Sequence, residues 1–341
     1  MNLSDFDYTL PEELVALHPP TERGASRLLV MDKRTGAVKD QLYANLVEFL
    51  QTGDLLVINN TRVLPARLLA KTGEGNDREL LLLEQHGKTK DHHSSLVMYR
   101  RKIKPGQKLF VGKTELAVDE VFQNGTAKVS SSKDLWELAE QMGHVPLPPY
   151  MHREDSLEDR ARYQTVFAKQ KGSVAAPTAS LNLTEELLAR IKEKGITVAE
   201  ITLHVGLGTF MPIRVDDVTE HKMHQEYFEI PASSAEAIRL AKRENRRVVA
   251  VGTTVTRTLE FAAKQIMSTS QDINGEADFF IYPGYDFKIV DVLLTNFHAP
   301  HSTVLMMAAA FAGWDNLKAA YTYAISKGYK FLSYGDSMLI H

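Results

Sequence analysis

The 341-residue chain contains no cysteine at all. This absence excludes disulfide bonds, thiolate ligands for zinc or iron–sulfur clusters, and a thiol nucleophile. The chain also lacks a long apolar segment, because its longest apolar run, residues 304–313, is too short to span a bilayer. The first ten residues include Asp5 and Asp7 and no apolar core, so we expect no signal peptide. Together these features predict a soluble, cytoplasmic protein with no membrane contact.

The chain has no strong excess of either charge. It carries 40 basic and 43 acidic residues, for a net charge of −3. A basic field over the whole molecule is therefore excluded, although a local basic face is not. Basic residues gather in two segments, 100–108 and 239–247. A solvated surface is the simpler explanation of either segment.

The pattern along the chain indicates two kinds of structure. Residues 1–63 contain short strands and a helix. Residues 64–149 contain several short β-like runs separated by turn signals, which is typical of a small barrel. Residues 150–341 alternate between strands and helices, which is typical of a sheet covered by helices. We therefore predict a three-layer α/β domain, formed by residues 1–63 and 150–341, with an inserted all-β barrel at residues 64–149.

Local signals place several elements of the second α/β segment. Thr184 and Ser302 are expected to cap the starts of two helices, and Ser233 with Glu236 resembles a capping box. Residues 248–251 and 279–282 are expected to form strands, and residues 254–266 a helix. The resulting order of strands and helices predicts a mostly parallel sheet.

Residues 248–260 (VVAVGTTVTRTLE) read as a buried strand, a turn of small residues and a helix. This geometry points free backbone N–H groups toward the space above the end of the strand. Thr253, Thr254 and Arg257 would then bind a carboxylate or a phosphate. A tight turn capped by its own threonines explains the same stretch equally well. No G-x-G-x-x-G followed by a helix is present, so a dinucleotide fingerprint is not supported.

Histidine is the main candidate for proton transfer, because cysteine is missing. His204 and His298 follow strand-like runs, and His224 lies in EHKMHQE. Strand ends are where α/β sheets carry their chemistry. Neither H-E-x-x-H nor H-x-x-E-H is present, so we expect no metal site. For any single histidine, a structural role remains the simpler reading.

Two further stretches could contact a ligand. Residues 173–180 (SVAAPTAS) carry little side-chain bulk, which lets a ligand approach the backbone closely or simply forms a linker. Tyr282 and Tyr285 flank a Pro-Gly turn, where their rings could stack on a purine. Aromatic residues beside turns more often pack into the core.

Taken in order, many short motifs along the chain resemble one family, the S-adenosylmethionine:tRNA ribosyltransferase-isomerases. The resemblance covers essentially the whole chain. The motifs that carry it are LVINNTRVLPARL (56–68), PLPPY (146–150), RYQTVFA (162–168), GSVAAPTA (172–179), TLHVGLGTF (202–210), EHKMHQE (220–226), VAVGTTVTRTLE (249–260), FIYPGYDFKIVD (280–291), LTNFHAPHSTVLM (294–306), AFAG (310–313) and SYGDSMLI (333–340).

The resemblance implies an α/β domain with an inserted barrel and a transferase acting in queuosine biosynthesis. Such an enzyme transfers and isomerises the ribosyl moiety of S-adenosylmethionine onto 7-aminomethyl-7-deazaguanine at the tRNA wobble position. The products are epoxyqueuosine-tRNA, adenine and methionine. S-adenosylmethionine is a substrate, and no metal or other cofactor is implied. We expect a monomer whose segment 100–108 contacts the tRNA backbone.

The sequence departs from the family pattern in one loop. Where the family usually reads Gly-Leu-His-Phe-Thr, this chain reads SLNLT, so that Ser180 and Asn182 replace glycine and histidine. Asn182 is a candidate substrate-binding residue, because asparagine can form hydrogen bonds, but it cannot exchange a proton near neutral pH. Ala299 and Ser337 replace the usual leucine and alanine. The loop motivates an alternative: a paralogue that binds tRNA or S-adenosylmethionine but has lost or changed the chemistry. A metal-dependent hydrolase is a third hypothesis, which predicts sensitivity to chelators.

Overall fold

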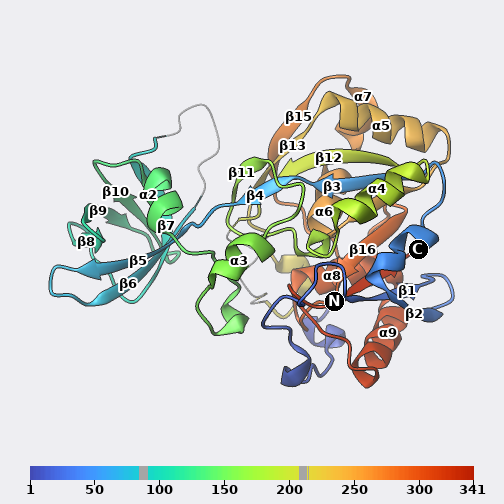
Figure 1. Ribbon diagram of the computed structural model, residues 1–341, viewed down its shortest axis with the longest axis horizontal. Helices are drawn as coiled ribbons and strands as arrows, with labels where there is room; N and C mark the ends of the chain where they lie inside the picture. Colours follow the sequence, from blue (N-terminus) through green and yellow to red (C-terminus); the bar gives the residue numbers. More distant parts are fainter. Residues whose placement is uncertain (84–90, 207–212, 214) are drawn as a thin grey trace.

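A computed structural model describes residues 1–83, 91–206, 213 and 215–341. Within these residues the chain forms a large α/β domain and a smaller barrel that lies to one side of it (Figure 1). Both chain termini belong to the α/β domain. The barrel is inserted between two strands of the α/β domain, so two crossings of the chain connect the two parts.

The α/β domain is built on a nine-stranded sheet in the described part of the chain. Strands β12, β3, β14 and β16 run parallel to one another. Strand β17 is antiparallel to β16, and the strands at both outer ends of the sheet pair in antiparallel. The carboxyl ends of these four strands therefore meet at one edge. The strands in spatial order are β15 (Ile273–Ala277), β13 (Glu226–Ile230), β12 (Thr197–Leu203), β3 (Leu55–Asn59), β14 (Val248–Val251), β16 (Val292–Asn296), β17 (Ser337–Ile340), β1 (Arg27–Met31) and β2 (Val38–Leu42).

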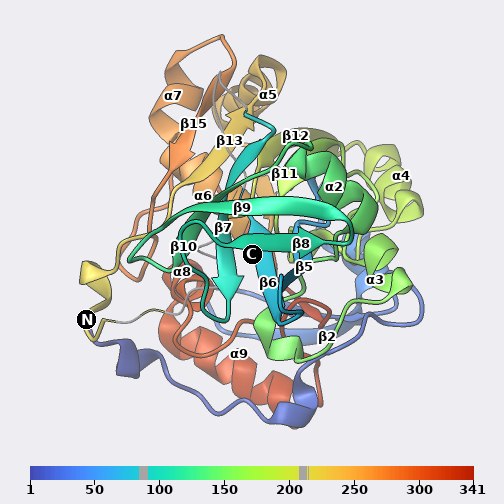
Figure 2. The same cartoon turned by 90° about the vertical axis from the view of Figure 1, so that its left-hand side faces the viewer.

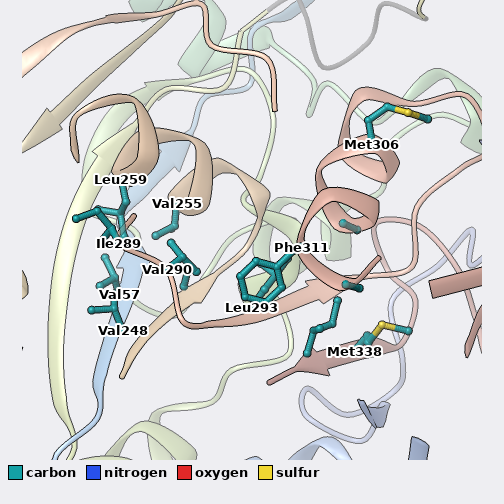
Figure 3. Close-up of a cluster of buried hydrophobic side chains, with 14 of the residues drawn as sticks. Val57, Val248, Val255, Leu259, Ile289, Val290, Leu293, Met306, Phe311 and Met338 are labelled. Carbon is teal, nitrogen blue, oxygen red and sulfur yellow. The ribbon is translucent and has the colours of Figure 1, made fainter. Parts of the chain in front are cut away.

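Helices cover both faces of the sheet, because successive strand residues point to opposite sides. Val57, Val248 and Leu293 face the core under one set of helices, and their neighbours Leu56 and Val249 face the other (Figure 3). The first set is α5 (Ala232–Arg243), α6 (Thr253–Phe261), α7 (Ala263–Ser268), α8 (Thr303–Ala312) and α9 (Trp314–Ser326). The second set is α1 (Leu46–Phe49) and α4 (Glu185–Glu193). Three layers result.

The inserted segment forms a closed antiparallel barrel of six described strands. In Figure 2 the barrel lies in front of the α/β domain, on the side that faces the viewer. Its core is separate from those of the α/β domain. The helix α2 (Leu135–Met142) packs beside it and is capped by Asp134. Around the barrel the order is β10 (Thr126–Ser130), β7 (Ser94–Arg100), β6 (Asp77–Leu82), β5 (Arg67–Thr72), β8 (Lys108–Val111) and β9 (Thr114–Val121).

Short elements connect the two parts. Strands β4 (Thr61–Val63) and β11 (Gln170–Ser173) pair in parallel, and α3 (Leu157–Arg162) follows the returning linker. Asp159 of α3 is buried and accepts hydrogen bonds from Arg153, Ser156 and Tyr334, which fastens the linker to the α/β domain. Short 3-10 helices occur at Leu3–Phe6, Glu12–Leu14, Tyr43–Asn45, Pro149–Met151, Thr178–Ser180 and Val218–Glu220.

The structure confirms the predicted fold class and corrects some details. The sheet is mixed rather than mostly parallel. Residues 279–282 form no strand, because residues 279–281 line a cavity instead of pairing with a neighbouring strand. Helix α5 begins at Ala232 after Pro231, so Ser233 is not its cap. The helix expected at 254–266 is divided into α6 and α7 at Ala262.

Candidate active site

A cavity of 460 Å³ lies at the carboxyl edge of the parallel strands. Ligand pockets in proteins are typically about 300–1,000 Å³. Its walls come from the segments after β14 and β16, the small-residue segment and the linker that returns from the barrel. The lining thus joins six ranges that are distant in sequence: 148–150, 175–179, 252–257, 279–281, 295–304 and 332–333.

The turn at the start of α6 forms one end of the cavity. Gly252 has φ +98° and ψ 157°, a conformation essentially restricted to glycine. No side chain caps α6, so its first N–H groups remain available for a ligand. The Thr254 hydroxyl is buried without a hydrogen-bond partner among the described residues. The turn therefore presents unsatisfied donors to the cavity, which suits an anion.

Arg257 lies one turn further along α6 and also lines the cavity. Its guanidinium forms an ion pair with the carboxylate of Glu226 from β13, and both side chains are buried. Glu226 additionally accepts a hydrogen bond of 3.1 Å from the Gly206 backbone N–H. Burial lowers the pKa of Arg257 to about 10, so the group stays cationic at neutral pH. The Arg257 Nε–H has no hydrogen-bond partner among the described residues and can donate to a ligand.

His298 lines the same cavity after the end of β16. Its Nε2 lies 2.8 Å from the Thr295 hydroxyl, and its backbone N–H donates to the Tyr321 hydroxyl. The Tyr8 hydroxyl donates to the His298 carbonyl oxygen. Burial lowers the pKa of His298 to about 3. The imidazole is therefore neutral at physiological pH and held in one orientation.

Aromatic rings supply much of the remaining wall. Tyr150, Tyr163, Phe279 and Phe280 all line the cavity. The Tyr150 hydroxyl accepts a hydrogen bond from the Ser333 N–H, and burial raises the pKa of Tyr150 to about 12. Within the described residues, no Asp or Glu side chain lines the cavity. A ligand cation would therefore meet aromatic faces, which attract cations, and no carboxylate.

Of the residues predicted from sequence, Thr253, Thr254, Arg257 and His298 are brought together around the cavity. The others lie elsewhere. They are His204, which is buried against Thr61 and stacks on Tyr227; His224, which is exposed; Tyr282, which packs on Phe280; Tyr285, whose hydroxyl donates to Glu260; and Asn182. The strand places Val205, the neighbour of His204, on the cavity wall.

Asn182 is enclosed behind the cavity wall rather than exposed in it. Its Oδ1 accepts a 3.0 Å hydrogen bond from the Ser26 hydroxyl. Its Nδ2 donates to the Gly335 carbonyl and to the Ser337 hydroxyl, at 3.3 and 3.4 Å. Asn182 and Ser337, two departures from the family pattern, are thus in contact. Ser180 does not have a positive φ, so its replacement of glycine costs no backbone strain.

Sequence reasoning missed two polar residues of the site. His301 lines the cavity, and its Nε2 lies 3.3 Å from a carboxylate oxygen of Asp7. It lies in the same segment as His298, so the strand-end argument applied to His298 could have included it. Glu226 follows His224 in the EHKMHQE motif and pairs with Arg257. No local signal distinguishes its buried side chain from the exposed one of His224.

Neither a metal centre nor a membrane span is found in the described part of the chain. Among the residues that the structure describes, no three His, Asp or Glu side chains gather to hold a metal ion. None of the helices described is long and apolar enough to cross a membrane.

Comparison with known proteins gives consistent matches over the full length. The sequence model of a family described as queuosine biosynthesis protein matches residues 3–340. Curated proteins from Chlorobium chlorochromatii and Chlorobaculum parvum, both named S-adenosylmethionine:tRNA ribosyltransferase-isomerase, are 55% and 54% identical, with both chains of each pair fully covered. The crystal structure of S-adenosylmethionine tRNA ribosyltransferase from Thermotoga maritima is similar with a TM-score of 0.57 and 33% identity, covering 99% of this chain and 100% of that one.

Proposed function

Because the chain belongs to the queuosine biosynthesis protein family, we propose that it is an S-adenosylmethionine:tRNA ribosyltransferase-isomerase. It transfers the ribosyl moiety of S-adenosylmethionine to the aminomethyl group of a 7-deazaguanine at the tRNA wobble position and isomerises it. Epoxyqueuosine-tRNA, adenine and methionine are the products. The observation that carries this proposal is the full-length identity of 51–55% to curated enzymes of that name.

The cavity at the sheet edge is the proposed binding site for S-adenosylmethionine. The methionine carboxylate binds the N–H groups at the start of α6 and the Arg257 guanidinium, because both offer donors and positive charge. The sulfonium lies among the aromatic rings, where no described carboxylate competes for it. Residues 175–179 carry small side chains and allow the rest of the ligand to lie close to the backbone.

His298 is the proposed proton acceptor. The sulfonium acidifies the hydrogens on C5′ of the ribose, and a neutral imidazole can remove one of them to form an ylide. Rearrangement of the ylide then expels adenine, and the aminomethyl nitrogen of the tRNA base attacks the sugar. An oxygen of the former ribose then bonds to C5′ to close the epoxide as the C5′–S bond breaks, and methionine leaves with the electron pair of that bond. Over the reaction the departing adenine takes up one proton and the attacking amine gives one up. The position of His298 supports the assignment, because its ring lines the cavity and is held in one orientation by the Thr295 hydroxyl.

The proposed chemistry uses S-adenosylmethionine as a substrate and needs no metal. A transition-metal chelator such as phenanthroline, added with magnesium present to keep the RNA folded, should leave turnover unchanged. Loss of turnover would instead favour a metal-dependent hydrolase.

Adenine release tests the function directly. Purified protein, S-adenosylmethionine and tRNA carrying the aminomethyl precursor should release adenine in step with consumption of the tRNA base. Unmodified tRNA serves as the control and should release none. Binding of both substrates without adenine release would support the non-catalytic paralogue.

A further inference from the structure

A second cavity, of 420 Å³, lies between the outer face of the barrel and the linker that returns to the α/β domain. Its floor is a row of side chains across three adjacent strands. Arg67 on β5 lies beside Leu81 on β6, which lies beside Met98 on β7. Because side chains alternate along a strand, all three point outward from the barrel. Residues 146–149 and 152–154 form the opposite wall.

Polar groups border this apolar floor. In the next row, Glu79 lies beside Arg100. The Glu79 carboxylate is 3.0 Å from Arg67 Nε and 3.8 Å from Arg100 Nη1. Tyr99 also contributes to the lining. The apolar side chains of Leu81 and Met98, edged by both donors and an acceptor, match a nucleobase, whose faces are apolar and whose edges are polar.

The second cavity adjoins the proposed reaction cavity. Pro148 and Pro149 line both, so one proline wall separates the two spaces. A nucleotide whose neighbour occupies the reaction cavity would therefore reach this groove. A third cavity, of 640 Å³, adjoins the groove and shares Arg67, Glu79, Arg100 and Glu154 with it.

The third cavity adds exposed positive charge. Lys71, Arg78 and Arg101 line it together with Arg100. The side chains of Arg100 and Arg101 are 68% and 65% exposed, so they can move to meet a ligand. Asp77 offsets part of this charge at the far end. The arrangement suits a chain of phosphates that passes along the arginines.

We propose that this barrel groove binds a nucleotide of the RNA substrate next to the modified one. The base lies on Leu81 and Met98, with its edge toward Glu79 and Arg67, and the adjoining phosphates contact Arg100 and Arg101. This inference rests on the proposed function for the identity of the RNA. It goes beyond that function by assigning the barrel a second nucleotide site that anchors the single-stranded loop.

The test measures RNA binding, which does not depend on turnover. A fluorescent anticodon stem–loop RNA is titrated with wild type, Arg100→Gln, Arg101→Gln and Met98→Ala, and anisotropy is followed at several salt concentrations. Lys113→Gln is the matched control. Lys113 is exposed in the turn between β8 and β9, and β9 lies across the closed barrel from β6.

Each arginine variant should weaken RNA binding about three- to tenfold. It should also reduce the slope of log Kd against log salt by about 0.7–0.9, the value for one lost phosphate contact. Met98→Ala should weaken binding with the salt slope unchanged, because stacking and apolar contact carry no charge. Lys113→Gln should bind like wild type, and the affinity for S-adenosylmethionine should be the same in all variants.

Two results would overturn the groove assignment. One is wild-type RNA affinity in all three groove variants, as expected if the groove instead receives a protein. The other is an equal loss in Lys113→Gln, which would mean that only overall charge matters. Failure of wild type to release adenine while the groove variants still lose RNA affinity would count against the proposed function and not against the groove.

Discussion

At the scale of single residues, the ion pair between Arg257 and Glu226 stabilises the fold, and Arg257 is also proposed to bind the ligand. Both side chains are buried, and Glu226 also holds the Gly206 N–H. Removing one partner of a buried pair leaves the other charge unpaired, at a cost of about 3–5 kcal/mol. A variant of Arg257 alone therefore mixes two effects, and the pair must be changed together to separate them.

Arg257→Gln should lower the free energy of unfolding and weaken S-adenosylmethionine binding about ten- to a hundredfold, the equivalent of about 1.5–3 kcal/mol. The double variant Glu226→Gln, Arg257→Gln removes both charges, so it should regain most of the stability but none of the affinity. Urea unfolding and calorimetric titration measure the two quantities. Recovery of affinity in the double variant would show that Arg257 does not contact the ligand.

His298 should make stability depend on pH. Its pKa is about 3 in the folded protein, against about 6.5 in an unfolded chain. Between these values the unfolded state binds more protons, so the free energy of unfolding falls as the pH is lowered through the window. Above pH 6.5 the contribution is fully present.

Comparison with His298→Gln isolates this contribution. Wild type should lose about 2 kcal/mol more than the variant between pH 7 and pH 5, because only wild type carries the buried imidazole. Urea unfolding at the two pH values measures the difference. Equal losses in wild type and variant would mean that the imidazole of His298 is solvated.

His298→Gln should also lower turnover about 10²–10⁴-fold if the imidazole is the proton acceptor.

At the scale of elements, local chemistry predicts where strands and helices begin better than where their side chains point. The strand at 248–251 and the caps Thr184 and Ser302 were predictable, because an apolar run and a capping hydroxyl act within a few residues. The positions of Thr253 and His298 just after strands also predicted them as site residues, and both line the cavity. Tyr282 and Tyr285 do not line this cavity, because the direction of an aromatic loop depends on packing against residues distant in the sequence.

The turn before α6 depends on a glycine. Gly252→Ala places a Cβ about 3.4 Å from the Ala179 Cβ and forces a side chain into a conformation nearly confined to glycine. We expect a loss of about 1–3 kcal/mol in stability and weaker S-adenosylmethionine binding. Gly284→Ala is the matched control, since its φ is +100° and its Cβ would meet nothing within 4 Å. Equal effects on ligand binding in both variants would contradict the role of the turn.

The loop around Asn182 should contribute to stability rather than to chemistry. Asn182→Ala removes three buried hydrogen bonds and should cost about 1–3 kcal/mol while leaving kcat of the folded enzyme unchanged. Asn182→His must fit a larger ring against the Ser337 hydroxyl, so Ser337→Ala should relieve part of its cost. A double-mutant cycle by urea unfolding should give a coupling of about 0.5–3 kcal/mol. Additive effects on the free energy of unfolding would disprove the contact between residues 182 and 337. A large fall in kcat for Asn182→Ala would mean that the loop takes part in catalysis.

At the scale of the whole molecule, the barrel and the α/β domain contain different proposed binding sites. The α/β domain contains the cavity proposed to bind S-adenosylmethionine, and the barrel contains the proposed nucleotide groove, which shares Pro148 and Pro149 with that cavity. The fold class could be predicted because the two textures occupy separate stretches of sequence. The adjoining cavities could not, because they depend on how the returning linker packs against the outer face of the barrel.

Transfer of the ribosyl group is the central claim, and isotope labelling tests it most directly. The protein is incubated with precursor tRNA and S-adenosylmethionine labelled with carbon-13 throughout the ribose, and the wobble nucleoside is analysed by mass spectrometry. The account predicts an epoxyqueuosine nucleoside whose mass carries the complete ribose label, and no label in it when only the S-methyl carbon is enriched. An unchanged precursor nucleoside, or one that gains the methyl carbon instead, would contradict it.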